Sequence, residues 1–205
     1  MIIGITGPTG SGKTTLLNAI RGFGGTVLDC DAIYHHLLAT DPALLRAIEN
    51  RFPGVVEDGV LQRKKLGALV FSDPAALADL NAITHTAVKE AVCSELAKDP
   101  PLAAIDAIGL FEGGLAELCD TTVAVIAPID DRIRRIMARD GISEEYARSR
   151  IAAQRSSAWF AQKCDHVLEN TGNLADCEAA CLAFLRKSGI IESFPLMKGA
   201  NPYDY

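Results

Sequence analysis

Residues 4–15, GITGPTGSGKTT, decide the fold class of this chain of 205 residues. The stretch fits the pattern of a glycine, four residues, a glycine, a lysine and a serine or threonine. The matching residues are Gly7, Gly12, Lys13 and Thr14. A β-branched run at 2–6 precedes the pattern, and apolar residues with helical spacing follow it at 16–20. A strand, a glycine-rich loop and a helix in this order predict a phosphate-binding loop; the alternative is a chance match in a glycine-containing turn.

In such a loop the lysine reaches the β- and γ-phosphates of a nucleotide and the threonine hydroxyl binds Mg²⁺. We therefore expect ATP and Mg²⁺ as cofactors, with Thr14 as the metal ligand. The expected ATP-binding residues of the loop are Gly7, Thr9, Gly10, Ser11, Gly12, Lys13, Thr14 and Thr15. The loop alone does not separate kinases from GTPases or other ATPases. The Asn-Lys-x-Asp motif of guanine-specific GTPases does not occur in the chain, which weakens the GTPase interpretation.

Composition restricts the partners of the protein. A formal net charge of -6 argues against a general nucleic-acid binder, because such binding relies on a basic surface. The 6 cysteines are scattered without a Cys-x-x-Cys pair, and a loop that begins at residue 7 leaves no room for a signal peptide. No apolar stretch approaches the ~18 residues of a membrane helix. We expect a cytoplasmic monomer with neither nucleic-acid nor membrane partners.

Strand and helix signals alternate along most of the chain. Strand signals lie at 2–6, 26–30, 102–111, 121–128 and 166–170, and further helix signals lie at 131–139, 143–155 and 174–187. This alternation predicts a three-layer α/β fold with a parallel five-stranded sheet. The nucleotide-binding core would comprise residues 1–30 and 102–188.

Residues 31–101 have a mostly helical pattern and form an expected insertion between the second and third strands. Asp41-Pro42 and Asp73-Pro74 each combine an N-cap residue with proline at the first helical position. A long amphipathic helix is expected from the second pair to about residue 98. The segment 189–205 is a C-terminal tail without a predicted role.

Acidic residues lie at the ends of two predicted apolar runs, at the edge of the sheet where open α/β folds bind ligands. Asp31, just after the second strand, can orient a hydroxyl and accept its proton, or can simply cap a helix beginning at Ala32. Asp106, which ends the apolar run LAAID of the next strand signal, can hold magnesium-bound water or can form a structural ion pair.

Arginines crowd the segment 132–155, which contains no lysine. They are Arg132, Arg134, Arg135, Arg139, Arg148, Arg150 and Arg155. Guanidinium groups suit phosphate oxygens, but each arginine can instead pair with a neighbouring acid on a solvated face. Asp140-Gly141 can act as a hinge, so residues 140–156 are expected to form a short helical lid over the phosphates.

Taken together, these motifs resemble the dephospho-CoA kinase family, over nearly the whole chain to about residue 172. The P-loop is similar to the family's, and so, in order, are VLDCDAIYHHLL, DGVLQRKKLGALVFSDPAALADLNAITHTAV, AIDAIGLFEGGL, RIMARDGISEEYARSRIAAQ and CDHVLENTG. The resemblance implies a P-loop kinase fold and transfer of the ATP γ-phosphoryl group to the ribose 3′-hydroxyl of dephospho-coenzyme A, the last step of coenzyme A biosynthesis. The substrates would be ATP and dephospho-CoA, with the helical insertion binding the acceptor.

The resemblance also implies site roles. Asp31 would be the general base and Lys13 the second catalytic residue. The implied acceptor site comprises Asp31, Arg63, His85, Asp106 and Arg150, and the implied ATP contacts beyond the loop are Arg135, Arg139 and Asn170.

Three departures from the family pattern leave the phosphate loop unchanged, and the first two concern the acceptor side. Thr86 stands where the family usually has proline, so the helix is expected to continue there. Gln62 replaces an acid, and residues 108–112 read IGLFE where the family tends to have PLLFE. Two alternative functions stay open: another P-loop small-molecule kinase acting on a nucleoside, nucleotide or sugar acid, and a nucleotide-binding switch protein.

Overall fold

The computed structural model describes residues 1–194 and divides into two compact units. Residues 1–28, 100–110 and 116–194 form the first, which we call the sheet unit. Residues 29–99 and 111–115 form the second, the helical unit. Of the predicted tail, residues 195–205 lie outside the described residues.

The sheet unit is built on a parallel five-stranded sheet with the order β2-β5-β1-β6-β7. Its strands are β1 (Ile2–Thr6), β2 (Thr26–Asp29), β5 (Ala103–Asp106), β6 (Thr121–Ile126) and β7 (His166–Glu169). The predicted α/β class and sheet are confirmed. The strand expected to continue to residue 111 ends at Asp106, where the chain enters turns and a short 3-10 helix, η1 (Ala116–Leu118).

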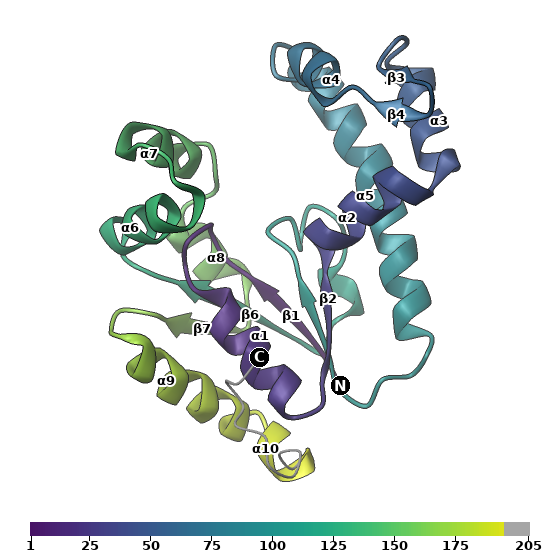
Figure 1. Cartoon of the computed structure of the whole chain (residues 1–205). Coiled ribbons are helices and arrows are strands. Elements are labelled where there is room, and N and C mark those ends of the chain that lie inside the picture. Colours follow the sequence, from purple (N-terminus) through teal and green to yellow (C-terminus); the bar gives the residue numbers. More distant parts are fainter. Residues whose placement is uncertain (195–205) are drawn as a thin grey trace. The chain divides into compact units, whose positions relative to one another are not determined.

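Helices flank this sheet (Figure 1). They are α1 (Lys13–Gly22), α6 (Ile129–Asp140), α7 (Glu144–Ala152), α8 (Ser157–Lys163), α9 (Leu174–Lys187) and α10 (Ile190–Ser193). α1 and α9 pack side by side, and α8 packs on β6 (Figure 1). Ile3, Leu16 and Leu185 are completely buried in the core between them. Burial of these side chains removes apolar area from water and holds α1 and the loop before it on the sheet.

α6 and α7 form a helical hairpin within the sheet unit. Ile136 on α6 packs with Ala147 and Ile151 on α7 in a small apolar cluster of their own. Gly141 ends α6 in the left-handed conformation, with φ 64°, and so turns the chain between the two helices. The hairpin covers most of the segment predicted as a lid.

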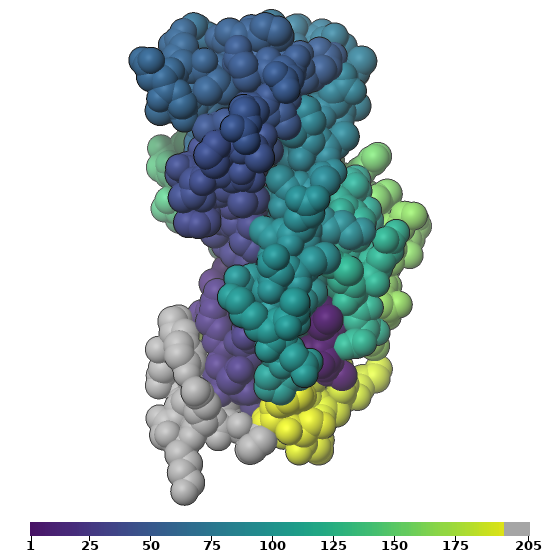
Figure 2. Space-filling model, turned by 90° about the vertical axis from the view of Figure 1, so that its right-hand side faces the viewer, coloured from purple at the N-terminus to yellow at the C-terminus, as the bar shows by residue number. Residues whose placement is uncertain are grey.

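The helical unit has a separate apolar core, which includes Leu44, Ile48 and Phe52. Its helices are α2 (Cys30–Thr40), α3 (Pro42–Arg51), α4 (Arg63–Val70) and α5 (Pro74–Leu96), and a hairpin of β3 (Val56–Glu57) and β4 (Val60–Leu61) joins α3 to α4. α2 and α5 lie side by side, dark blue and teal in Figure 2. α5 continues through Thr86, as the absence of proline predicts. Among residues 1–194, no helix has the length and hydropathy needed to span a bilayer.

Candidate active site

The loop between β1 and α1 has the backbone that the sequence pattern predicts. Gly7 and Gly12 have φ values of 137° and 95°, in the region that favours glycine. A Cβ atom on Gly7 would clash with the carbonyl oxygen of Val125, and one on Gly12 would clash with the side-chain amide of Asn170. Both positions therefore require glycine for conformation and for space.

The N-terminus of α1 is open to an anion. Gly12 is the N-cap residue and supplies no side-chain cap, and no acidic residue occupies the first turn. The first backbone N–H groups of a helix lack partners within it and carry the positive end of its dipole. Lys13 begins the helix, with its Nζ 3.3 Å from the carbonyl oxygen of Gly7, and Thr14 is exposed in the same turn. The arrangement fits a bound phosphate.

Asp106 brings a carboxylate to the same place. It ends β5, and its Oδ1 lies 4.0 Å from the Nζ of Lys13. The ion pair that the sequence allowed is present, and it involves the lysine of the phosphate loop. Thr14 and Asp106 offer oxygen ligands, the type that Mg²⁺ prefers. Residues 1–194 contain no cluster of three or more His, Cys, Asp or Glu side chains suited to a metal.

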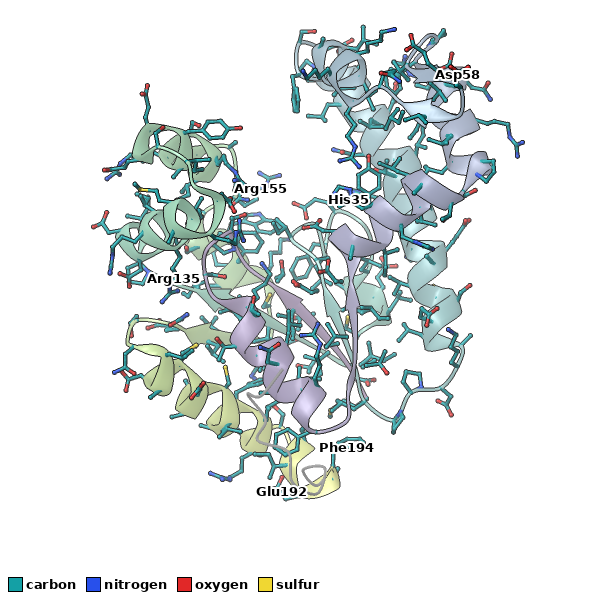
Figure 3. All side chains as sticks on the ribbon, in the orientation of Figure 1. His35, Asp58, Arg135, Arg155, Glu192 and Phe194 are labelled. Atoms are coloured by element: carbon teal, nitrogen blue, oxygen red, sulfur yellow. The ribbon has the colours of Figure 1, made fainter. Side chains whose placement is uncertain are left out.

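Two arginines of α6 contact the backbone of the loop. The Nε of Arg132 donates to the carbonyl oxygen of Thr9 at 2.9 Å, and burial lowers the pKa of this guanidinium. Arg135, labelled in Figure 3, donates to the carbonyl oxygens of Gly10 at 3.3 Å and Ser11 at 3.2 Å. Asn170 accepts from Arg135 and donates to the Ser11 carbonyl at 2.9 Å. The predicted ATP contacts Arg135 and Asn170 thus lie against the loop.

Arg134, Arg139, Arg148 and Arg150 have acidic partners, whereas the guanidinium of Arg155 lies over the ring of Trp159. Asp140 accepts hydrogen bonds from Arg139 at 2.7 Å and from Arg150 at 2.5 Å. The Arg139 guanidinium, with Arg150 in support, lowers the pKa of the Asp140 carboxyl to about 2. Arg148 pairs with Glu144 at 2.7 Å. These pairs match the solvated-face interpretation, and the ATP role of Arg139 and the acceptor role of Arg150 stay predictions.

A cavity of about 320 Å³ adjoins Arg135 in the sheet unit. It is lined by Asp131, Arg134, Arg135, Thr171 and Gly172. Arg135 links it to the phosphate loop, so the cavity is in a position to hold the remainder of a nucleotide whose phosphates lie at α1. Arg134 and Asp131 form an ion pair in its wall.

In the helical unit, Asp31 does not cap a helix. α2 begins at Cys30, and Asp29 is its N-cap residue, with its carboxylate accepting from the N–H of Ala32 at 3.0 Å. The capping interpretation of Asp31 is therefore wrong, because the helix begins two residues earlier than the sequence suggested. Asp31 is exposed in the first turn of α2 and available for chemistry.

A second cavity of about 320 Å³ lies in the helical unit, between α2, β4 and the start of α4. Its lining is His35, Leu38, Ala39, Gly59, Val60, Leu61 and Arg63. The Nη2 of Arg63 lies 3.2 Å from the Nδ1 of His35, which is labelled on α2 in Figure 3. The family resemblance implied Arg63 as a site residue, but His35 was not predicted. The only sequence signal for His35 was its position one helical turn beyond Asp31. His85 lies half-buried on α5, and it is not part of this lining.

Comparison with known proteins identifies the family of the chain. The family model described as dephospho-CoA kinase matches residues 1–176. The chain belongs to the dephospho-CoA kinase family. The dephospho-CoA kinase of Thermus thermophilus is 39% identical over 186 residues, which cover 90% of each chain. That of Deinococcus radiodurans is 40% identical over 189 residues, covering 90% of this chain and 91% of the relative.

Solved structures share the fold of this chain. The crystal structure of TT1252 from Thermus thermophilus superimposes with a TM-score of 0.77 at 38% identity, over 91% of this chain and 97% of that one. A shikimate kinase from Bacteroides thetaiotaomicron matches with a TM-score of 0.54 at 17% identity, over 92% of this chain and 98% of the other. The second likeness shows that the fold is shared with other P-loop kinases.

Proposed function

We propose that this protein transfers the γ-phosphoryl group of ATP to the ribose 3′-hydroxyl of dephospho-coenzyme A, giving coenzyme A and ADP. The observation that carries the proposal is the open N-terminus of α1, with Lys13 and Asp106 beside it, in a member of the dephospho-CoA kinase family. We place the reaction in the cytoplasm, where the free state of all six cysteines is expected.

The loop and α1 would hold the phosphates of ATP. The loop amides and the helix dipole stabilise negative charge, and Lys13 reaches the β- and γ-phosphates as the bond to the γ-phosphoryl group breaks. Thr14 and Asp106 would hold Mg²⁺ directly or through water. When bound, this ion neutralises charge on the phosphate oxygens.

The helical unit would bind the acceptor. Asp31 accepts the proton of the 3′-hydroxyl, so that the oxygen attacks the γ-phosphorus. Arg63 and His35 are suited to anionic or hydrogen-bonding groups of dephospho-CoA in their cavity, and His85 adds a further contact. Residues 31–101 are thus assigned to acceptor binding, residues 1–30 and 102–188 to the nucleotide, and residues 140–156 to a lid. We propose that the enzyme acts as a monomer.

A coupled assay of ADP release, with ATP and Mg²⁺, tests the proposed reaction. Dephospho-CoA should stimulate ADP release and be converted to coenzyme A, identified by mass. A folded protein that binds ATP but shows no stimulation by dephospho-CoA would overturn the proposal.

The same assay with a panel of nucleosides, nucleotides and sugar acids separates the alternative acceptors. Preference for one of them would assign the chain to another small-molecule kinase activity. Tight nucleotide binding without turnover of any acceptor would support a switch protein instead.

A further inference from the structure

Three successive carbonyl groups of the phosphate loop are each bound by an arginine side chain. Arg132 binds the carbonyl oxygen of Thr9, and Arg135 binds those of Gly10 and Ser11. An anion-binding loop must turn its N–H groups toward the anion and its carbonyl oxygens away from it. Donors that fix these carbonyls therefore also fix the direction of the amides that follow them. The arginines stabilise the loop in its binding conformation before any nucleotide arrives.

Gln154 fixes Thr9 in a second way. Its Oε1 accepts from the backbone N–H of Thr9 at 3.0 Å, and its Nε2 donates to the Thr9 hydroxyl at 2.6 Å. Arg132 adds a 3.4 Å contact from its Nη2 to the same Oε1. Thr9 is thus held at its amide, its hydroxyl and its carbonyl, and only 9% of its surface is exposed.

These contacts come from one packed element. Arg132 lies on α6 and is 4% exposed, and Gln154 follows the last turn of α7. The two helices share the apolar cluster around Ile136 and Ile151, so they move together more readily than apart. The hairpin of α6 and α7 therefore binds Thr9 of the loop through two side chains, those of Arg132 and Gln154.

We propose that Gln154 is a positioning residue for the nucleotide, which sets the loop for phosphate binding through its two hydrogen bonds to Thr9. The proposal rests on the proposed kinase function for its biological meaning, but it concerns the ATP half of the site alone. It assigns a role to a glutamine that the site residues discussed above do not include.

Calorimetric titration with ATP and Mg²⁺ tests this role, because it needs no acceptor. Gln154→Ala should raise the Kd for ATP roughly tenfold. Each of the two lost hydrogen bonds stabilises the loop by about a factor of five, and part of that stabilisation is lost from the affinity for ATP. Gln162→Ala, which truncates an exposed glutamine on α8, is the matched control and should leave the Kd within about twofold of the wild type. A Kd for folded Gln154→Ala within about twofold of the wild type would overturn the proposal.

A double-mutant cycle separates positioning from general loss of structure. Gln154→Met keeps a side chain of similar size but can make neither hydrogen bond to Thr9, and Thr9→Val removes the Thr9 hydroxyl. Both variants lose the same bond, so the double variant should bind ATP no more weakly than the weaker single variant. Effects that multiply instead would overturn the role of this bond. If Gln154→Ala does not fold, this cycle still tests the positioning role of Gln154.

The two proposals fail in different ways. If the wild-type protein binds ATP but does not phosphorylate dephospho-CoA, the proposed reaction is wrong. The ATP affinities of the variants still decide the role of Gln154 in that case. Normal activity on dephospho-CoA with unchanged ATP affinity in all variants would overturn only the role of Gln154.

Discussion

The Nζ of Lys13 lies 4.0 Å from the Oδ1 of Asp106, and the two side chains are 15% and 17% exposed. This pair joins the first residue of α1 to the last residue of β5. A carboxylate so close to the helix N-terminus keeps the lysine in place while the loop is free of phosphate. Under the proposed function, a bound nucleotide brings its own negative charge, and the same carboxylate would then be available to Mg²⁺ and its water ligands.

Replacement of Asp106 by asparagine should therefore weaken the use of Mg²⁺. The Mg²⁺ concentration for half-maximal rate is expected to rise by ~10-fold or more, the range for losing a partner of a metal site. Steady-state ADP release over a Mg²⁺ titration measures this directly. Asp130→Asn, at an aspartate with an 80% exposed side chain, serves as the control. If the Mg²⁺ dependence of the rate were unchanged, Asp106 would have no role in Mg²⁺ binding, and only its contact with Lys13 would stand.

Substitutions at Asp31 and Asp29 should separate the loss of a catalytic base from the loss of a helix cap. Asp31→Asn is expected to lower turnover by ~10²-fold or more, the range for losing a general base, while ATP affinity stays close to that of the wild type. Asp29→Ala removes the cap of α2 and should cost about 1 kcal/mol of stability with a much smaller loss of rate. Turnover numbers and thermal unfolding of both variants decide the point. Normal turnover in Asp31→Asn would exclude it as the base.

Local signals in the sequence were sufficient for most of the sheet and the longer helices. β-branched runs predicted the strands, and the helix expected at 174–187 coincides with α9. α8 was missed because Ser157–Lys163 is too short for a helical period to stand out. The β3–β4 hairpin was missed within the segment predicted as mostly helical, since strands of two residues carry no alternation. Asp58 and Gly59, both with positive φ, form its turn, and Asp-Gly is a typical turn pair.

The site was predictable to the extent that it is contiguous in sequence. Lys13 and Thr14 follow the loop glycines directly, so one motif contains the phosphate-binding residues. Arg132 and Gln154 bind Thr9 although each lies more than a hundred residues away from it in the chain. No local pattern in the sequence encodes such contacts. For the same reason no local pattern pointed to His35, whereas the family resemblance implied a role for its neighbour Arg63.

Glu49 should give the helical unit a pH-dependent stability. Its carboxylate accepts the N–H groups of Gly54 at 2.6 Å, Val55 at 3.1 Å and Val56 at 2.7 Å. These bonds, led by that of Gly54, lower the pKa of Glu49 below its ordinary value of 4.5. A lowered pKa means that the stabilisation is complete above the unfolded value and is lost as the pH falls through the folded one.

Glu49→Gln should consequently lower the unfolding temperature at about pH 7, and the difference from the wild type should shrink as the pH falls below about 4.5. Thermal unfolding followed by circular dichroism across this range provides the measurement. Glu90→Gln, at an exposed position on α5, is the control for loss of a charge. A difference that stays constant with pH would mean that the glutamine fails for reasons of shape and not of charge.

Arg63 should determine affinity for the acceptor and not for ATP. Its guanidinium lies in the wall of the cavity beside His35, in a unit that does not contain the phosphate loop. Loss of a charge-assisted hydrogen bond weakens binding by roughly tenfold to a hundredfold, so Arg63→Ala should raise the KM for dephospho-CoA by about that factor. Lys64→Ala removes the neighbouring exposed charge and should change the KM by less than about threefold. Steady-state kinetics with each substrate varied in turn distinguish the two effects. If Arg63→Ala instead raised the KM for ATP alone, the cavity of the helical unit would not be the acceptor site.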